Sequence, residues 1–506
     1  MEHYNWHKSR RIVRNLRERI FKATREGNLK KIRNLQRLLL KSYSNILQSV
    51  RRATQENKGK FTPGIDKIIV KTPAARGILV DALCKQIPWK PLPTKRTYIK
   101  KKSGKLRPLS IPSIVDRCLQ GIHKNALEPY WEAQFEPSSY GCRPGRSCHD
   151  ALQDIYSSAN SHSRNKWVLD ADIDGCFDNI NHDQLMELIG NYPGKDLIRK
   201  WLKSGYLDNS VFHITENGVP QGSIISPLLA NIALHGLEIA LGTKWRKVYK
   251  KDKVVSRRKG NTTLIRYADD LVVLCRTKNE AEEATDTLKR FLNHRGLQFS
   301  SEKTNIVHLE EGFDFLGWNI RQYKDIRFKQ ETKLLTKPSK ESINSVKEKL
   351  RTAIREYRDG DIKIMIVKIN EIIRGWANYH RAAVARKTFE HLDDWMWTKL
   401  QKVATRRHPK KTPGWCKRKY FGRFHPNRRD KWIFGDKQSG IFVLKFCWFN
   451  IERHAKIKGD ASPDNPELRP YWKQRQENRD KNRVHAELTG LKRRVALRQN
   501  CRCPIC

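Results

Sequence analysis

The sequence has no long apolar run. Its longest stretch without a charged residue extends from Asn217 to Leu237, and Pro220, Pro227 and His235 interrupt it. A membrane-spanning helix needs about 20 predominantly apolar residues, so this stretch makes a poor span. The N-terminal segment MEHYNWHKSRR has neither an apolar core nor a cleavage site, so we expect no signal peptide. We therefore expect neither a membrane protein nor a secreted one.

Cysteine and acidic residues are both scarce. Eleven cysteines in 506 residues are too few for a disulfide scaffold, and their odd number argues against complete pairing. We therefore expect a reduced, cytoplasmic protein. Only 53 Asp and Glu stand against 102 Lys and Arg, which gives a net charge of +49. Such an excess favours a polyanionic partner, with nucleic acid as the first candidate and an acidic protein as the alternative.

The composition and the hydrophobic pattern change along the chain. Residues 1–60 predict basic amphipathic helices, because apolar residues recur every three or four positions and 17 Lys and Arg stand against 4 acidic residues. Residues 61–330 mix short strand-like runs with helical stretches. Residues 331–405 are again helical, and residues 406–500 are basic and rich in tryptophan. At roughly 150 residues per domain, the length suggests about three domains.

Two adjacent carboxylates lie between two apolar runs in the segment Leu264–Leu274. The pattern predicts a β-hairpin with Asp269 and Asp270 at its tip. Because aspartate also favours turns for conformational reasons alone, an isolated Asp-Asp pair is more often simple turn chemistry.

A second strand-like segment, residues 167–174, carries Asp170, Asp172 and Asp174 at alternate positions. Alternate residues of a strand lie on one face. Carboxylates at the ends of two strands are the oxygen ligands that Mg²⁺ prefers, and a pair of such ions activates a hydroxyl nucleophile and neutralises the leaving group. The sequence therefore predicts a candidate site for two Mg²⁺ ions.

Five motifs resemble those of reverse transcriptases, in the order that this family has them. Along the chain they are Asp172–Phe177, Pro220–Pro227, Tyr267–Asp270, Gly296–Thr304 and Phe315–Gly317. One such motif is weak evidence, but five in order within about 150 residues make chance an unsatisfactory explanation.

Further segments resemble one subclass, the group II intron-encoded proteins. They are Tyr98–Pro112, Tyr140–Ser147, Arg374–Tyr379 and His454–Pro463. The resemblance covers essentially the whole chain.

The resemblance implies an α+β right-hand polymerase. Residues 1–60 would form a helical extension, residues 61–330 the fingers and palm, residues 331–405 the helical thumb or maturase region, and residues 406–500 a DNA-binding region. It implies RNA-directed DNA synthesis from deoxynucleoside triphosphates with two Mg²⁺ ions, on an RNA template with a DNA primer. It also implies binding of a group II intron RNA as a maturase, and insertion of that intron into target DNA.

The resemblance assigns catalytic roles to carboxylates. Asp172 and Asp269 would bind the metal ions together with the carbonyl oxygen of Ile173, and Asp270 would complete the catalytic set. Asp170 and Asp174 are more doubtful and suit surface or supporting positions.

The resemblance also assigns residues that bind substrate. Lys101 and Arg107 would bind the triphosphate, and Phe177 would reject a ribose 2′-hydroxyl by its volume. Gln221 and Gly222 would line the nucleotide pocket. Lys303 would donate a proton to pyrophosphate or orient it. The candidates for binding nucleic acid are seven arginines: Arg10, Arg11, Arg14, Arg17, Arg143, Arg406 and Arg407.

The C-terminal residues depart from the family. Residues 501–506 resemble only the start of an HNH-type nuclease, with Cys503 and Cys506 as one Cys-x-x-Cys pair. A closed zinc site needs four ligands, so we expect the nuclease to be missing or truncated. The tryptophans in and near the basic region suit either base stacking or core packing, and the sequence leaves both interpretations open. They are Trp395, Trp397, Trp415, Trp432 and Trp472.

Two other functions remain open from sequence alone. One is a reverse transcriptase recruited to a CRISPR-associated or phage-defence role, although the thumb and DNA-binding segments argue against it. The other is a non-enzymatic RNA-binding splicing factor, although the intact Asp172 and Tyr267–Asp270 argue against it.

Overall fold

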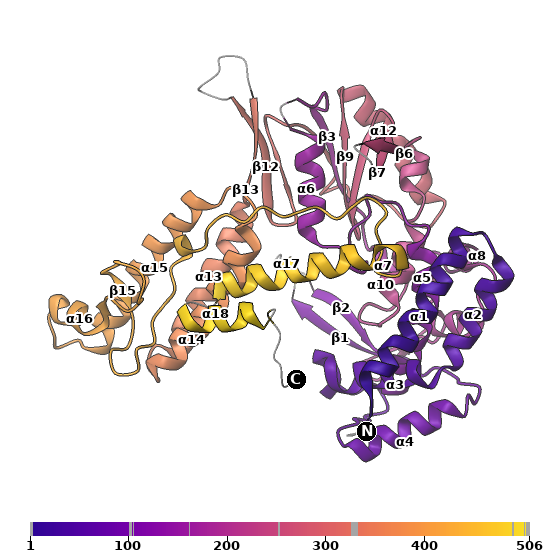
Figure 1. The fold of residues 1–506 in the computed structure, drawn as a ribbon, viewed down its shortest axis with the longest axis horizontal. Helices are drawn as coiled ribbons and strands as arrows, with labels where there is room; N and C mark the ends of the chain where they lie inside the picture. The colour runs from indigo at the N-terminus through magenta and orange to yellow at the C-terminus, as the bar shows by residue number, and fades with distance from the viewer. Residues whose placement is uncertain are drawn as a thin grey trace.

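The computed structural model describes residues 4–100, 104, 106–160, 162–250, 253–324, 332–487, 490–499 and 501. It mixes helices and sheets throughout, as expected for an α+β protein (Figure 1). Among the described helices, none is long and apolar enough to cross a membrane.

Helices form the N-terminal part of the chain, as the hydrophobic pattern predicts. They are α1 (Trp6–Arg25), α2 (Leu29–Lys41), α3 (Tyr43–Arg51), a π-helical turn (Arg52–Glu56), a 3₁₀ turn (Lys58–Phe61) and α4 (Pro73–Cys84). Asn5 and Asn28 cap α1 and α2 by accepting bonds from backbone N–H groups of the first turn. The apolar faces of α1 and α2 pack on α5 (Ile114–Glu132), so these helices belong to the main body of the protein.

A four-stranded sheet, here called the outer sheet, follows the N-terminal helices. Its strand order is β2 (Leu106–Ile111), β1 (Thr94–Lys100), β4 (Tyr206–Asp208) and β5 (Val211–His213). All its pairs are antiparallel except the pair β1–β4.

A second four-stranded sheet, here called the central sheet, carries the predicted carboxylates. Its order is β10 (Asn305–His308), β3 (Trp167–Asp172), β9 (Asp270–Cys275) and β8 (Thr263–Tyr267), with every pair antiparallel.

Side chains alternate between the two faces of the central sheet. Leu169 and Val273 face a core shared with α8 (His182–Ile189), α10 (Ser226–Ala233) and α12 (Lys278–Asn293). Val168 and Val272 face a second core shared with α6 (Cys148–Ser158). Helices therefore cover both faces of the sheet and hold its strand ends in fixed positions (Figure 1).

Shorter elements connect these sheets. The helices are α7 (Cys176–Asn179), α9 (Lys195–Leu202) and α11 (Leu237–Ala240), and a hairpin joins β6 (Lys244–Lys250) to β7 (Lys253–Lys259). A three-stranded sheet contains β11 (Phe313–Phe315), β12 (Trp318–Lys324) and β13 (Thr332–Pro338). Strands β12 and β13 pair along their whole length, so residues 318–324 and 332–338 belong to one sheet.

A helical lobe follows from residue 340, whereas residues 332–338 of the segment expected to be helical form β13. The lobe contains α13 (Lys340–Tyr357), α14 (Ile362–His380) and α15 (Arg386–Arg407). The same core continues through α16 (Pro413–Tyr420), β14 (Phe421–Gly422), β15 (Ile433–Phe434) and a 3₁₀ turn (Phe446–Trp448). Residues 406–448 therefore contribute side chains to the core of this lobe.

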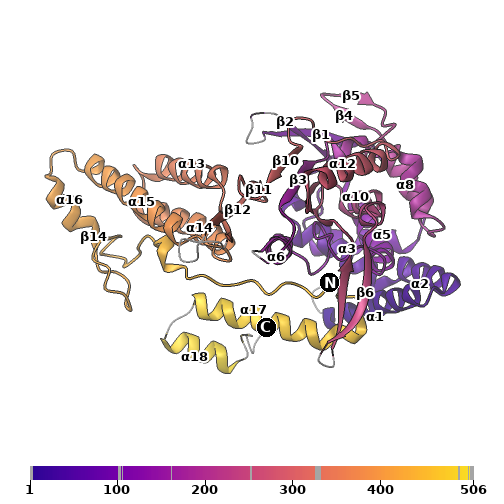
Figure 2. The same cartoon turned by 90° about the horizontal axis from the view of Figure 1, so that it is seen from above.

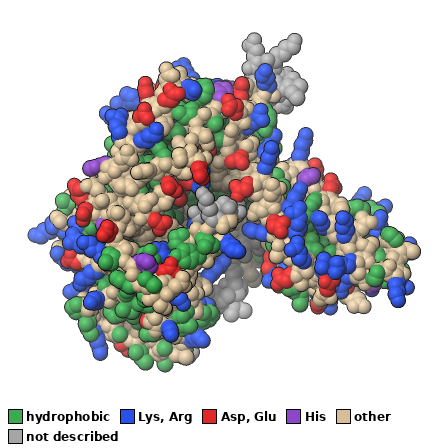
Figure 3. Space-filling view, turned by 180° about the vertical axis from the view of Figure 1, so that it is seen from behind, with side chains coloured by type: hydrophobic (Ala, Val, Ile, Leu, Met, Phe, Trp, Pro, Cys, Tyr) green, Lys and Arg blue, Asp and Glu red, His purple; other side chains and the backbone are tan. Residues whose placement is uncertain are grey.

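The chain then returns to the main body. Figures 1 and 2 show residues 449–465 running from the helical lobe back toward α1, followed by a 3₁₀ turn (Pro466–Leu468), α17 (Arg469–Glu487) and α18 (Gly490–Arg498). We call residues 449–475 the strap. Ile457 and Ala461 of the strap are buried in the core beside α6. Figure 3 shows Lys and Arg side chains over both lobes, with the surface hollowed between them.

Candidate active site

The predicted hairpin is present. Tyr267 at the end of β8 pairs with Asp270 at the start of β9, and only Ala268 and Asp269 connect them. Ala268 has a φ of +59°, in the left-handed region. Gly141 lies directly against this turn, since a Cβ at residue 141 would come within 2.2 Å of the Ala268 backbone nitrogen. Residue 141 must therefore be small, because it packs directly against the backbone of the turn.

The structure brings three carboxylates together at one end of the central sheet. Asp172, the last residue of β3, lies opposite Asp270 in the β3–β9 register, and Asp269 lies next to it in the turn. Burial and the neighbouring carboxylates Asp269 and Asp172 raise the pKa of Asp270 to about 7. Burial also raises the pKa of Asp269. The site therefore concentrates negative charge that a cation would stabilise.

The two more doubtful aspartates lie in different positions. Asp170 is on the same strand face as Asp172 but further along β3, where burial, together with Asp270 and Asp314, raises its pKa to about 7. Asp174 is exposed and lies beyond the end of the strand.

Two cations approach the carboxylates. The Lys303 ammonium donates to the Asp172 carboxylate, and this bond raises the pKa of Lys303. Backbone pairing positions the segment before Lys303, because the Ser300 N–H donates to the Asp172 carbonyl at 2.8 Å. The positive charges of Arg107 and Lys303 partly offset the raised pKa of Asp269. Arg107 is exposed on β2 of the outer sheet.

The other predicted substrate residues meet where the outer sheet joins the main body. The Phe177 carbonyl accepts from the Val219 N–H at 2.6 Å, which brings the segment containing Gln221 alongside α7. The Gln221 carbonyl accepts from the Ser110 N–H of β2, also at 2.6 Å. Gly222 has a φ of +105°, and a Cβ there would lie 3.0 Å from the Ser110 carbonyl oxygen. The loop therefore links Phe177 to β2 through close backbone contacts. Lys101 lies outside the described residues.

Several predicted nucleic-acid ligands lie on the surface. Arg10, Arg11 and Arg14 are exposed on α1, and Arg406 is exposed at the end of α15. Arg407 is half-buried and donates to the carbonyl oxygens of Arg358 and Gly360 at 2.6 and 2.9 Å.

Arg17 and Arg143 do not suit the role expected for them. The Arg17 side chain is 13% exposed and bridges Glu128 to Asp464 of the strap, at 2.9 and 2.7 Å. The Arg143 side chain is 2% exposed and forms a bidentate ion pair with the Glu132 carboxylate. Because buried carboxylates already hold both guanidinium groups, we do not keep them as phosphate ligands.

Sequence reasoning missed the first turn of α6, which joins segments from distant parts of the chain. Asp150 is fully buried and accepts bonds from His454 and from the Ile457 N–H of the strap, both at 2.8 Å. The Cys148 thiol contacts Tyr267 of the β8–β9 hairpin and Tyr379 of α14, and burial together with these contacts raises the pKa of both phenols. The only local signal is a capping box of Ser147 and Asp150, which predicts a helix start and not these partners.

The donor set suits a hard divalent cation. Among the described residues, no three His, Cys, Asp or Glu side chains form a ready-made metal-binding group. Mg²⁺ commonly binds one or two carboxylates and takes its other oxygens from water and substrate phosphates. Asp172, Asp269 and Asp270 offer only oxygen ligands and their charges repel one another, so the residues present fit Mg²⁺.

Comparisons with known proteins identify the family. Residues 99–320 match the model of the reverse transcriptase (RNA-dependent DNA polymerase), and residues 2–83 match the N-terminal domain of reverse transcriptase. Residues 343–421 match the group II intron, maturase-specific domain. The chain is 32% identical to the group II intron-encoded protein LtrA of Lactococcus lactis over 435 residues, covering 73% of this chain and 69% of LtrA. The chain belongs to the group II intron-encoded proteins.

Two other relatives match more than half of this chain. Protein YkfC of Escherichia coli is 34% identical over 56% of this chain and 83% of its own length. Maturase-like protein 1 of Euglena gracilis is 25% identical over 75% of this chain and 77% of its own length. As a group II intron-encoded protein, the chain combines an RNA-directed DNA polymerase with a maturase region, as its motifs predict.

The family matches can be placed on the structure. The reverse transcriptase match contains the central sheet and all three carboxylates, and the maturase match contains α13 to α16. None of the three matched models is a nuclease. Cys503 and Cys506 lie outside the described residues.

Proposed function

We propose that the carboxylate end of the central sheet is a two-metal polymerase site that copies RNA into DNA. The observation that carries this proposal is the pairing of Asp172 with Asp270 beside Asp269, with Lys303 bonded to Asp172 and with the positive charge of Arg107 partly offsetting the raised pKa of Asp269. In the proposed architecture the outer sheet belongs to the fingers, the central sheet is the palm, and α13 to α15 form the thumb.

The chain's own residues divide the work. Asp172 and Asp269 would hold two Mg²⁺ ions with the Ile173 carbonyl, and Asp270 would add negative charge to the site. Bound Mg²⁺ activates the primer hydroxyl and neutralises charge on the phosphates. Arg107 and Lys303 bind the triphosphate through charge-assisted hydrogen bonds, and Lys101 shares this role.

Two further features support nucleotide binding. Phe177 lies where the segment containing Gln221 meets the outer sheet, which supports a role for its ring in excluding a ribose 2′-hydroxyl. Gly222 lets the loop backbone approach Ser110, which leaves Gln221 and Gly222 to line the nucleotide pocket.

The nucleic-acid partners follow from the same assignment. The exposed arginines of α1 contact intron RNA, which is the substrate of the maturase activity. Arg406, with the less exposed Arg407, contributes to binding target DNA during insertion of the intron. The high net charge of the chain supports both contacts.

The test compares two aspartates that are close in sequence and different in position. Asp172→Asn should abolish primer extension on an RNA template, because it removes a charge from the site without changing side-chain volume. The control Asp174→Asn should retain extension, since Asp174 is exposed beyond the strand. Both variants should bind RNA as the parent does. Extension by Asp172→Asn at the rate of Asp174→Asn would overturn the proposal.

A further inference from the structure

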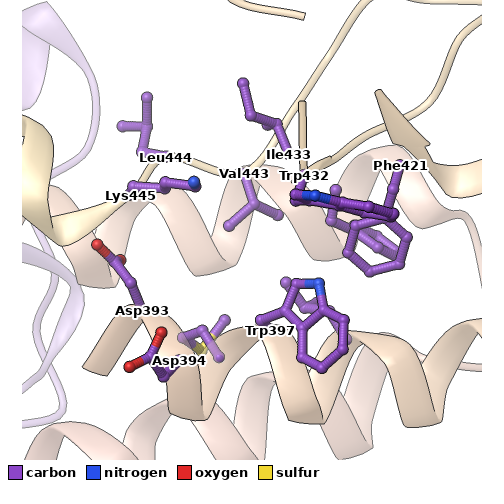
Figure 4. Close-up of a pocket in the computed structure, with 12 residues that line it drawn as sticks. Asp393, Asp394, Trp397, Phe421, Trp432, Ile433, Val443, Leu444 and Lys445 are labelled. Atoms are coloured by element: carbon purple, nitrogen blue, oxygen red, sulfur yellow. The ribbon is translucent and has the colours of Figure 1, made fainter. Parts of the chain in front are cut away.

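A cavity of about 290 Å³ lies in the helical lobe, away from the central sheet (Figure 4). Helix α15 forms one side of the cavity, and the segment from Phe421 to Lys445 forms the other. Trp397 and Trp432 line it with Phe421, and its remaining lining includes the buried side chains of Leu400 and Val443. Its volume is at the lower end of ligand pockets, which span about 300–1,000 Å³, so it suits a single ring system.

One end of the cavity is polar. Asp393, Asp394 and Lys445 lie there, as Figure 4 shows. Asp393 already accepts from the backbone N–H groups of Phe446 and Cys447 at 2.7 and 2.9 Å, and Lys445 bonds Asp430 at 3.0 Å. Asp394 is exposed at the rim. The pocket therefore offers aromatic walls and one exposed carboxylate that accepts hydrogen bonds.

The surrounding charge selects the class of ligand. Residues 406–445 carry thirteen Lys and Arg against two Asp. The Lys417 ammonium lies 5.5 Å from the centre of the Trp397 ring. A cationic peptide would be repelled by this surface, whereas a nucleic-acid strand would be attracted to it. Unstacked bases bind by stacking on aromatic side chains and by hydrogen bonds to their Watson–Crick edge.

We propose that this pocket binds one unstacked nucleobase, with guanine preferred. The base stacks on the tryptophan walls while the surrounding cations hold the flanking phosphates. Guanine presents two adjacent N–H donors on its Watson–Crick edge, which match the two oxygens of the Asp394 carboxylate. Adenine presents one amino group there, so it binds less tightly. This site is separate from the polymerase site and does not depend on it.

The test uses the full chain and short single strands that differ at one position. A 12-nucleotide uridine RNA and its thymidine DNA counterpart each carry guanine, adenine or an abasic residue at the centre. The parent protein should bind the guanine strand about tenfold more tightly than the abasic strand, within the range of base–aromatic stacking. Trp432→Ala should bring the two affinities close together, and 55% exposure of Trp432 makes the variant compatible with folding. Asp394→Asn should keep the difference between guanine and abasic strands but lose the preference for guanine over adenine.

Trp415→Ala is the matched control. Trp415 lies in the same basic segment, between Lys411 and Lys419 and outside the pocket lining, so this variant should keep both preferences. A preference seen in only the RNA or only the DNA series supports the proposal and identifies the strand. Equal affinity of the parent for guanine and abasic strands in both series would overturn it, as would equal losses in Trp415→Ala and Trp432→Ala. The pocket lies away from the central sheet, and its guanine preference is measured by binding alone, so this result is independent of the polymerase assignment.

Discussion

Replacing Asp150 with alanine should release the strap from the main body. The substitution leaves the Ile457 N–H, His454 and Arg475 without their shared acceptor, which now lies 2.8, 2.8 and 3.2 Å from them. Breaking a buried ion pair costs about 3–5 kcal/mol. We take the lower value, because the His454 and Arg475 side chains are 27% and 23% exposed. At 1.36 kcal/mol per tenfold change, the equilibrium constant for release of the strap from the main body should rise roughly 100-fold.

Hydrogen exchange at the Ile457 amide measures this directly, since that N–H donates to Asp150. Its protection should fall roughly 100-fold in Asp150→Ala, and proteases should cleave residues 449–468 faster. Asp480→Ala is the control, because Asp480 lies on α17 outside the strap, where its carboxylate accepts an exposed hydrogen bond from Gln476 at 2.8 Å. Unchanged exchange at Ile457 in Asp150→Ala would refute the assignment of Asp150 as the point that fixes the strap.

The same contact has a defined pH dependence. Burial alone would raise the pKa of Asp150, but the hydrogen bond and charge of His454, together with the hydrogen bonds from Ser147 and the Ile457 N–H, outweigh it and lower the pKa to about 2. Because the folded pKa is below the unfolded value, the stabilisation is complete above the unfolded pKa of about 4 and is lost as the pH falls toward 2. Protection at Ile457 should therefore fall over this window in the parent protein and change less in Asp150→Asn.

Three further predictions concern polymerisation and RNA binding. Gly141→Ala should lower the rate of nucleotide incorporation at least tenfold without weakening RNA binding, because its Cβ would displace the turn at Ala268; a normal rate would show that the turn tolerates displacement. Phe177→Ala should raise ribonucleotide incorporation relative to deoxyribonucleotides in single-turnover assays, and an unchanged ratio would make Phe177 a packing residue only. The exposed arginines of α1 are Arg10, Arg11 and Arg14. Replacing all three with glutamine should reduce the slope of log affinity against log salt for intron RNA by about 2, at roughly 0.7 per contact. An unchanged slope would show that the RNA binds elsewhere.

Local patterns predicted the hairpin and the N-terminal helices well. Apolar runs on both sides of Asp269 and Asp270 require a tight turn between two strands, and β8 and β9 form it. The three- and four-residue spacing of apolar side chains predicted α1 and α2 because packing on α5 needs one continuous apolar face.

Long-range partners could not be predicted in the same way. Arg17 and Arg143 look like surface cations in the sequence, yet each is held by a carboxylate whose position depends on the complete fold. Asp150 and His454 are 304 positions apart, and no periodicity connects them. The basic composition of residues 406–500 likewise gave no sign of a shared core, but Phe421, Phe434 and Phe446 pack in the helical lobe. The composition of a segment indicates the charge of its surface, but it does not predict which other elements its apolar side chains pack against.

Divalent-metal dependence of primer extension tests the central claim most directly. The purified protein, with a DNA primer on an RNA template, is stripped with EDTA and then titrated with Mg²⁺ while cDNA is quantified. The carboxylate site predicts no extension without a divalent cation and full recovery with Mg²⁺ in the parent protein, but no recovery in Asp269→Asn at any concentration. Extension that persists in EDTA, or that Mg²⁺ restores in Asp269→Asn, would contradict a polymerase site built on these carboxylates.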